Sequence, residues 1–116
     1  MKRNVWILGI AILSVAVALL PQVPLAAAGD KKAAARGKEV FEKKCAICHF
    51  AESEMKKIGP GLKGISKRGT FTINGNKVTT ESLTTWIENG DALMPPMKET
   101  LEPAQIKDVV AYVKTL

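Results

Sequence analysis

The residues best suited to metal or redox chemistry lie together in one five-residue stretch, CAICH, at positions 45 to 49. It holds Cys45, Cys48 and His49, and the sequence of 116 residues has no other cysteine and no other histidine. In a helical turn, residues i, i+3 and i+4 share one face, so the two sulfurs and the ring nitrogen are expected to point the same way. The stretch therefore predicts a ligand that takes both sulfurs and the nitrogen.

The N-terminal segment indicates the compartment in which this chemistry would take place. It has two basic residues, an uncharged run from Val5 to Leu20, and three alanines that end at Ala28. That order is typical of a secretory signal peptide, with 1–28 as the signal peptide and 29–116 as the mature domain. The alternative is an uncleaved membrane anchor, because sixteen apolar residues exceed a usual signal core but fall short of the about 20 residues of a span. Either way the remaining chain lies outside the cytoplasm, and we expect a periplasmic protein without a membrane span in its mature form.

Three kinds of site could use the CAICH residues in an exported chain. A structural zinc ion needs four ligands, and these three are crowded too closely to surround one ion. A disulfide or thioredoxin-like redox pair is the serious alternative, but the redox interpretation needs a βαβ context, and nothing near residue 45 alternates like a buried strand. The pattern C-x-x-C-H is instead typical of c-type haem attachment, in which both thiols add to the haem vinyl groups and the histidine ligates iron.

Length and composition agree with a small domain built around a cofactor. Removal of the leader would leave 88 residues, and a domain of this size usually depends on a disulfide, a metal or a cofactor. The formal net charge falls from +6 to +4 with the two leader charges, so the positive charge is mild and we expect no nucleic-acid partner. A large apolar prosthetic group would fill a core with few aromatic residues. These are Phe41, Phe50, Phe71, Trp86 and Tyr112.

Three amphipathic segments could position the motif. Apolar residues at helical spacing over 33–48 predict a helix that leads into CAICH, after a start at 29–35 that we expect to be frayed. A second helix is expected over about 80–89, with a left-handed cap at Gly90. A third begins at Pro103, a favoured first helical residue, and repeats isoleucine and valine along one face. The sequence therefore predicts an all-α fold with about three main helices around a cofactor.

Four further elements accompany CAICH in a characteristic order. Gly37 and Phe41 precede it, GPGLKG follows at 59–64, Met-Pro stands before the final helix, and Val109 and Tyr112 lie within that helix. With them the chain resembles a class I monohaem cytochrome c of the small bacterial type. The resemblance implies the class I cytochrome c fold, with helices wrapped around one haem attached through the two cysteines. It also implies that the first and last helices cross at the glycine, where two backbones can approach closely.

The resemblance also assigns roles within the haem pocket. Pro60 stands where a carbonyl oxygen accepts the Nδ1 hydrogen of the ligating histidine, which would leave Nε2 of His49 to the iron; a plain turn is compatible with the same residues. Leu62 would pack on the face of the haem. Trp86 resembles the tryptophan that lies beside the haem or reaches a propionate, and a simple core tryptophan is the alternative.

The sixth ligand is expected from ALMPPM, which offers Met94 and Met97. In the family the ligand precedes a proline, with a leucine seven residues further on, and Met94 with Pro95 and Leu101 matches both. Two consecutive prolines form a stiff segment that presents a side chain at a fixed distance. We therefore favour Met94 as the axial ligand opposite His49, with a methionine that only packs in the core as the alternative.

Two loop features depart from the family pattern. Glu102 stands where a serine or threonine helix cap is expected, and the stretch TFTINGNKV at 70–78 has no clear counterpart. Within that stretch, Asn74-Gly75 is a possible hairpin turn. Both features concern loops, and neither affects the expected ligation.

The expected coordination indicates a function. With histidine and methionine both bound, the iron would have no open position, and Met/His ligation raises its potential. We therefore expect an electron carrier, not an enzyme, with one haem c as cofactor. The alternatives are a haem enzyme or gas sensor with a labile methionine, and a haem-free thiol oxidoreductase.

Basic residues near CAICH and GPGLKG indicate how redox partner proteins would dock. They predict partners with acidic docking surfaces, and a set of merely solvated lysines is the alternative. The residues are Lys43, Lys44, Lys56, Lys57, Lys63, Lys67 and Arg68.

Overall fold

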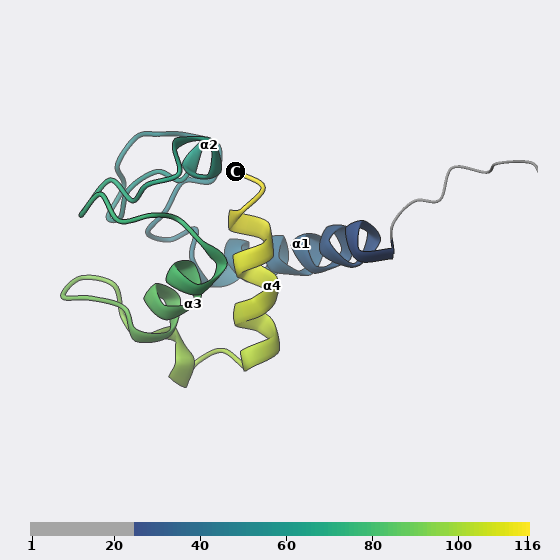
Figure 1. Ribbon diagram of the computed structural model, residues 1–116. Coiled ribbons are helices and arrows are strands. Elements are labelled where there is room, and N and C mark those ends of the chain that lie inside the picture. Colours follow the sequence, from purple (N-terminus) through teal and green to yellow (C-terminus); the bar gives the residue numbers. More distant parts are fainter. Residues whose placement is uncertain (1–24) are drawn as a thin grey trace, which may run out of the picture.

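A computed structural model describes residues 25–116, which form the predicted all-α fold (Figure 1). The elements in order are α1 (Leu25–Lys44), α2 (Ile65–Arg68), α3 (Thr80–Asn89), the 3₁₀-helix η1 (Met97–Glu99) and α4 (Pro103–Val113). The three longest, α1, α3 and α4, correspond to the three expected helices. From residue 25 onward, no helix is long and apolar enough to cross a bilayer.

The start of α1 bears on the expected leader. The apolar run of the predicted signal peptide lies outside the described residues, while the predicted cut after Ala28 falls within the first turn of α1. The segment 29–35, expected to be frayed, is helical instead. Alanine and lysine are strong helix formers, so this segment continues the helix toward CAICH.

The helices α1 and α4 cross (Figure 1), and Gly37 of α1 lies at the crossing. A Cβ atom there would overlap the backbone carbonyl of Asp108 and would lie 2.9 Å from Cβ of Tyr112. Beside the crossing, the rings of Phe41 and Tyr112 meet edge to face with centroids 5.4 Å apart. On the other side, the guanidinium of Arg36 donates hydrogen bonds of 2.7 and 2.8 Å to the Asp108 carboxylate. The crossing that the resemblance implied is therefore present, and it depends on the missing side chain of Gly37.

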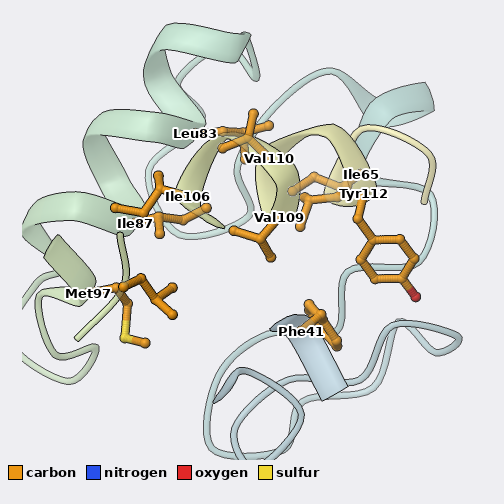
Figure 2. Packing of buried hydrophobic residues seen from close by; sticks show 11 residues of the cluster. Phe41, Ile65, Leu83, Ile87, Met97, Ile106, Val109, Val110 and Tyr112 are labelled. Carbon is orange, nitrogen blue, oxygen red and sulfur yellow. The ribbon is translucent and has the colours of Figure 1, made fainter. Parts of the chain in front are cut away.

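The apolar core is centred on α4. Figure 2 shows the buried cluster, in which Val109 is 1% exposed. The isoleucine and valine face predicted for the last helix is buried in it. Near the end of α4, Ser66 of α2 donates to the carbonyls of Lys114 (2.7 Å) and Leu116 (3.3 Å), which ties α2 to the C-terminus (Figure 1). The cluster consists of Phe41, Ile65, Leu83, Ile87, Met97, Leu101, Ile106, Val109, Val110, Tyr112 and Val113.

Two helix ends differ from the simple expectation. Gly90, which follows α3, has a positive φ of 62° as expected, but its ψ of −159° lies outside the left-handed helical region. The prediction of a left-handed cap was wrong, because the backbone of Gly90 packs against the Met94 carbonyl instead. At the start of α4, the N–H of Glu102 donates to Oε1 of Gln105 at 2.9 Å. Gln105 thus completes the cap where a serine or threonine was expected.

The stretch 70–78 forms a turn that packs beside α3. The N–H of Phe71 donates to the Asn76 carbonyl and the N–H of Gly75 to the Phe71 carbonyl, both at 2.9 Å. A two-residue Asn-Gly hairpin turn requires a positive φ at both residues. Gly75 has a φ of 72°, but all described residues with a positive φ are glycines, so Asn74 does not meet this requirement. The ring of Phe71 stacks on Trp86 with centroids 5.4 Å apart. The turn is thereby held against α3.

Candidate functional site

The CAICH stretch follows α1 as one more helical turn. The N–H groups of Cys48 and His49 donate to the carbonyl of Cys45 at 3.0 and 2.9 Å. The three side chains line one cavity, as the i, i+3, i+4 spacing predicted. The turn therefore presents two sulfurs and an imidazole to the same space.

The sulfurs of Cys45 and Cys48 do not form a disulfide with each other. Burial, with a smaller contribution from Cys48, raises the pKa of the Cys45 thiol to about 11. A redox-active or nucleophilic CxxC motif needs a thiolate, and its thiol pKa is lowered accordingly. The environment of Cys45 therefore does not match that of a thiol oxidoreductase.

The ring of His49 is held by the GPGLKG loop. Its Nδ1 lies 2.9 Å from the carbonyl oxygen of Pro60, so the tautomer with hydrogen on Nδ1 donates there and leaves Nε2 as a lone-pair donor. A Cβ atom at Gly59 would overlap this ring, and the N–H of Gly59 donates to the Cys48 carbonyl at 2.8 Å. The loop can lie against the imidazole because Gly59 has no side chain.

Lys57 braces the CAICH turn from the solvent side. Its Nζ donates to the carbonyl of Ala46 at 2.7 Å and lies 5.2 Å from the centroid of the Phe50 ring. The sequence placed this residue among the lysines available to a partner. In the structure it contacts its own chain, between the two attachment cysteines.

The cavity that these groups face has a volume of about 260 Å³. Its walls are mostly apolar and come from all five helical elements and the loops between them. A cavity of this kind with few, convergent polar donors is the usual form of a cofactor site. It brings together every residue that the sequence placed in the site. These are Cys45, Cys48, His49, Pro60, Leu62, Trp86 and Met94.

Sequence reasoning missed an apolar rim at the mouth of this cavity. Four lining residues are largely exposed, with Leu93 at 79% and Ile47 at 72%; the others are Ile58 and Ile73. Large aliphatic residues in otherwise polar loops were the available signal, because exposed apolar groups that gather in one place mark a binding surface.

The two methionines of ALMPPM differ in their surroundings. Met97 is 9% exposed, belongs to the buried cluster (Figure 2), and places its sulfur 4.0 Å from Oγ1 of Thr100. Met94 is half-buried and packs against the cluster from its edge. Both line the cavity, but only Met97 is part of the core.

The backbone of Met94 is fixed by Asp91. One carboxylate oxygen of Asp91 accepts hydrogen bonds from the N–H groups of Met94 (2.8 Å) and Leu93 (2.9 Å), and its own N–H donates to the Met94 carbonyl (2.9 Å). The bonds from the Met94 and Leu93 amides hold the pKa of the Asp91 carboxyl below its ordinary value. At the base of the same loop, Nζ of Lys98 donates to Oδ1 of Asn89 at 3.0 Å.

The donor set fits haem and does not fit a bare metal ion. Among residues 25–116, no cluster of three or more histidine, cysteine, aspartate or glutamate side chains is placed to hold an ion. The cavity instead offers two thiols, one imidazole with a fixed tautomer and a thioether, set in apolar walls. Two thiols can add to the vinyl groups of a haem, and an imidazole nitrogen and a thioether sulfur are both able to ligate its iron.

Comparison with known proteins agrees with this donor set. Residues 34–116 match the family model described as cytochrome c. The chain is 35% identical over 113 residues to cytochrome c6 of Rippkaea orientalis, which covers 97% of this chain and 92% of that protein. It is 32% identical over 98 residues to cytochrome c of Euglena viridis (72% and 96% covered), and 35% identical over 105 residues to cytochrome c of Chlamydomonas reinhardtii (77% and 91% covered).

Proposed function

Because the chain belongs to the cytochrome c family, we propose that it carries single electrons with His49 and Met94 as the axial ligands of its iron. The class I monohaem fold of this family binds one haem c covalently, here through the cysteines of CAICH. When bound, the haem supplies one-electron chemistry at its iron. The observation that carries the proposal is that the CAICH donors and Met94 meet in one apolar cavity.

The residues around the ligands have supporting roles in this proposal. Pro60 holds the Nδ1 hydrogen of His49, which orients the ring and raises the basicity of Nε2. Leu62 and Trp86 form walls that keep water from the haem, and the stacking of Phe71 on Trp86 supports the second wall. Exclusion of water from the iron favours a small reorganisation on electron transfer.

With His49 and Met94 both bound, the iron would have no open position for a substrate, which favours a carrier over an enzyme. A haem enzyme or gas sensor would need a methionine that leaves the iron readily. The hydrogen bonds between Asp91 and the Met94 backbone support a methionine that remains bound to the iron. The third possibility, a haem-free thiol oxidoreductase, conflicts with the cytochrome c family to which the chain belongs.

Replacement of Met94 by alanine tests the ligation. The ferric protein should lose its methionine-to-iron charge-transfer band, and the ferrous protein should bind carbon monoxide at the vacated position. The reduction potential should fall by about 0.1 V or more, because axial ligands set haem potentials over a range of about 0.8 V. Absorption spectroscopy and redox titration measure all three changes.

The matched control is Met97→Ala. Because Met97 is a core residue, its loss should lower the free energy of unfolding by about 2–5 kcal/mol while the charge-transfer band remains. If Met97→Ala abolishes the band and Met94→Ala keeps it, the ligand is Met97.

For the location, we propose that residues 1–28 are a signal peptide and that residues 29–116 act in the periplasm. The order of basic, apolar and small residues supports export. The alignment with cytochrome c6 of Rippkaea orientalis extends over 97% of this chain, and so includes most of this segment. An uncleaved segment that anchors the protein to the membrane is the alternative.

For the partners, we propose redox proteins with acidic surfaces that dock at the mouth of the cavity. Lys44, Lys56 and Arg68 line this mouth together with the apolar rim. Lys57 contributes its charge there, although its ammonium group is bonded to the CAICH turn. Positive charge around an apolar opening attracts an acidic partner. The apolar rim would then exclude water from the centre of the interface.

Reversal of charge at the mouth tests this docking. Lys44→Glu with Lys56→Glu should slow reduction by an acidic redox partner about tenfold at low salt, since electrostatic steering raises association rates by about 10 to 10³. The rate for the unaltered protein should fall as ionic strength approaches about 0.1 M. Stopped-flow absorption measures both effects.

The control carries the same change of charge at exposed positions that do not line the cavity, Lys31→Glu with Lys107→Glu. This variant should react at nearly the rate of the unaltered protein. Equal slowing by both pairs would mean that only the net charge matters, and docking at the cavity mouth would be rejected.

A further inference from the structure

The loop that carries Met94 has little packing of its own. It runs from Gly90, after α3, to Pro96, before η1. Met94 is half-buried, whereas Ala92, Leu93 and Pro95 are exposed, and Leu93 reaches 79%. Exposed apolar side chains add little packing that could fix a loop, so the place of Met94 depends on polar contacts and on the ends of the loop.

On its C-terminal side, Met94 is held by covalent geometry. Pro95 and Pro96 have fixed φ angles, and Met97 after them is anchored in the buried cluster. Prolines have no N–H group, so this side of the loop can donate few hydrogen bonds. The rotation of the Met94 peptide is therefore controlled from the other side.

On its N-terminal side, one residue contacts both polar groups of the Met94 backbone. The carboxylate of Asp91 accepts from the Met94 N–H, and the Asp91 N–H donates to the Met94 carbonyl. The same oxygen also accepts from Leu93. The backbone of Gly90 lies against the Met94 carbonyl, where a Cβ atom would overlap the carbonyl oxygen. A charged acceptor makes the stronger kind of hydrogen bond.

We propose that Asp91 is a positioning residue that keeps the sulfur of Met94 on the iron. This inference rests on the proposed His49/Met94 ligation. It assigns to Asp91 the role of keeping the methionine from leaving the iron. Without the carboxylate, the amides of Leu93 and Met94 lose their common acceptor and the loop is held only at its ends. The methionine then leaves the iron more often, although every ligand is still present.

The experiment compares Asp91→Ala with Asp91→Asn in the haem-loaded protein. Alanine removes the acceptor oxygen, while asparagine keeps an oxygen at the same place without the charge. Asp91→Ala should bind carbon monoxide in the ferrous state about tenfold faster, since one charged hydrogen bond is worth about a factor of ten or more in an equilibrium. Its ferric charge-transfer band should weaken. Asp91→Asn should restore most of the band.

Ala92→Ser is the control for a change in the same loop. Ala92 is exposed and does not line the cavity, so this variant should bind carbon monoxide at the unaltered rate. Far-UV circular dichroism and haem content should be the same for all variants, because Asp91 is exposed and its side chain accepts hydrogen bonds only from Leu93 and Met94 of its own loop.

The outcomes separate this inference from the proposed function. If the unaltered protein shows no methionine band, the ligation itself fails. If the band is present and Asp91→Ala keeps both the band and the slow carbon monoxide binding, Asp91 has no positioning role. An equal defect in Asp91→Asn would rule out the hydrogen-bond explanation, and a loss of helix in Asp91→Ala would show that Asp91 supports the fold instead.

Discussion

Replacement of both Cys45 and Cys48 by alanine should remove the covalent haem and leave a chain that is mostly unfolded. The thiols are the only covalent attachment that CAICH offers, and an apolar cavity of about 260 Å³ without its occupant costs at most about 6 kcal/mol at about 24 cal/mol per Å³. That is comparable to the whole stability of a small domain, about 5–15 kcal/mol. The variant should lose haem staining on a denaturing gel and helix signal in circular dichroism.

The unaltered protein supplies the reference measurement. Its intact mass should equal 88 residues plus one haem, which also tests removal of residues 1–28. Ile47→Ala is the control, because this side chain lies between the cysteines and is 72% exposed; it should keep its haem. Pigment that acid acetone extracts from the unaltered protein would disprove covalent attachment.

Substitution of alanine for Gly37 should destabilise the domain by about 3 kcal/mol or more, at the upper end of the usual cost of overpacking a core. In an open helix the same change would stabilise by about 1 kcal/mol. Here the new Cβ atom would overlap the backbone carbonyl of Asp108. A backbone group cannot turn aside as a side chain can, so α1 and α4 would have to separate.

Thermal unfolding of the haem-loaded protein measures this effect. Lys38→Ala, at the next position of α1, is the control, since Lys38 is exposed and its contact with Glu42 is a long 3.9 Å ion pair between exposed groups. Such surface changes usually alter stability by less than about 0.5 kcal/mol. An unchanged unfolding temperature for Gly37→Ala would mean that the helices can cross without the glycine.

The helices could be predicted where local chemistry marks their ends. The expected 80–89 segment coincides with α3, and α4 begins at Pro103 as expected. Both helices are marked by signals that lie within one or two turns of sequence, namely the apolar periodicity and the residues at the helix start. The extension of α1 through 29–35 differs from the expected frayed end, because its alanines and lysines favour helix even near a chain terminus. The ψ of Gly90 depends on the Met94 carbonyl, and no local pattern contains that contact.

The site divides in the same way. The cysteines and histidine of CAICH were predictable, because their spacing fixes their common face. The difference between Met94 and Met97 could be argued from sequence only by the following proline, whereas the structure separates them by burial in the core. The role of Asp91 was not visible, because an aspartate after a helix is common in turns of many kinds. Which amides it meets depends on the path of the whole loop.

The crossing of α1 and α4 has a consequence for the order in which the domain folds. The Arg36–Asp108 pair at this crossing joins positions 72 residues apart. Closing a loop of this length costs conformational entropy, which slows the formation of the contact. Val109 and Val113 of α4 also line the cavity, so the pocket lacks a wall until the last helix docks. In a chain whose C-terminal helix has not yet docked, the thiols of CAICH are reachable for haem attachment.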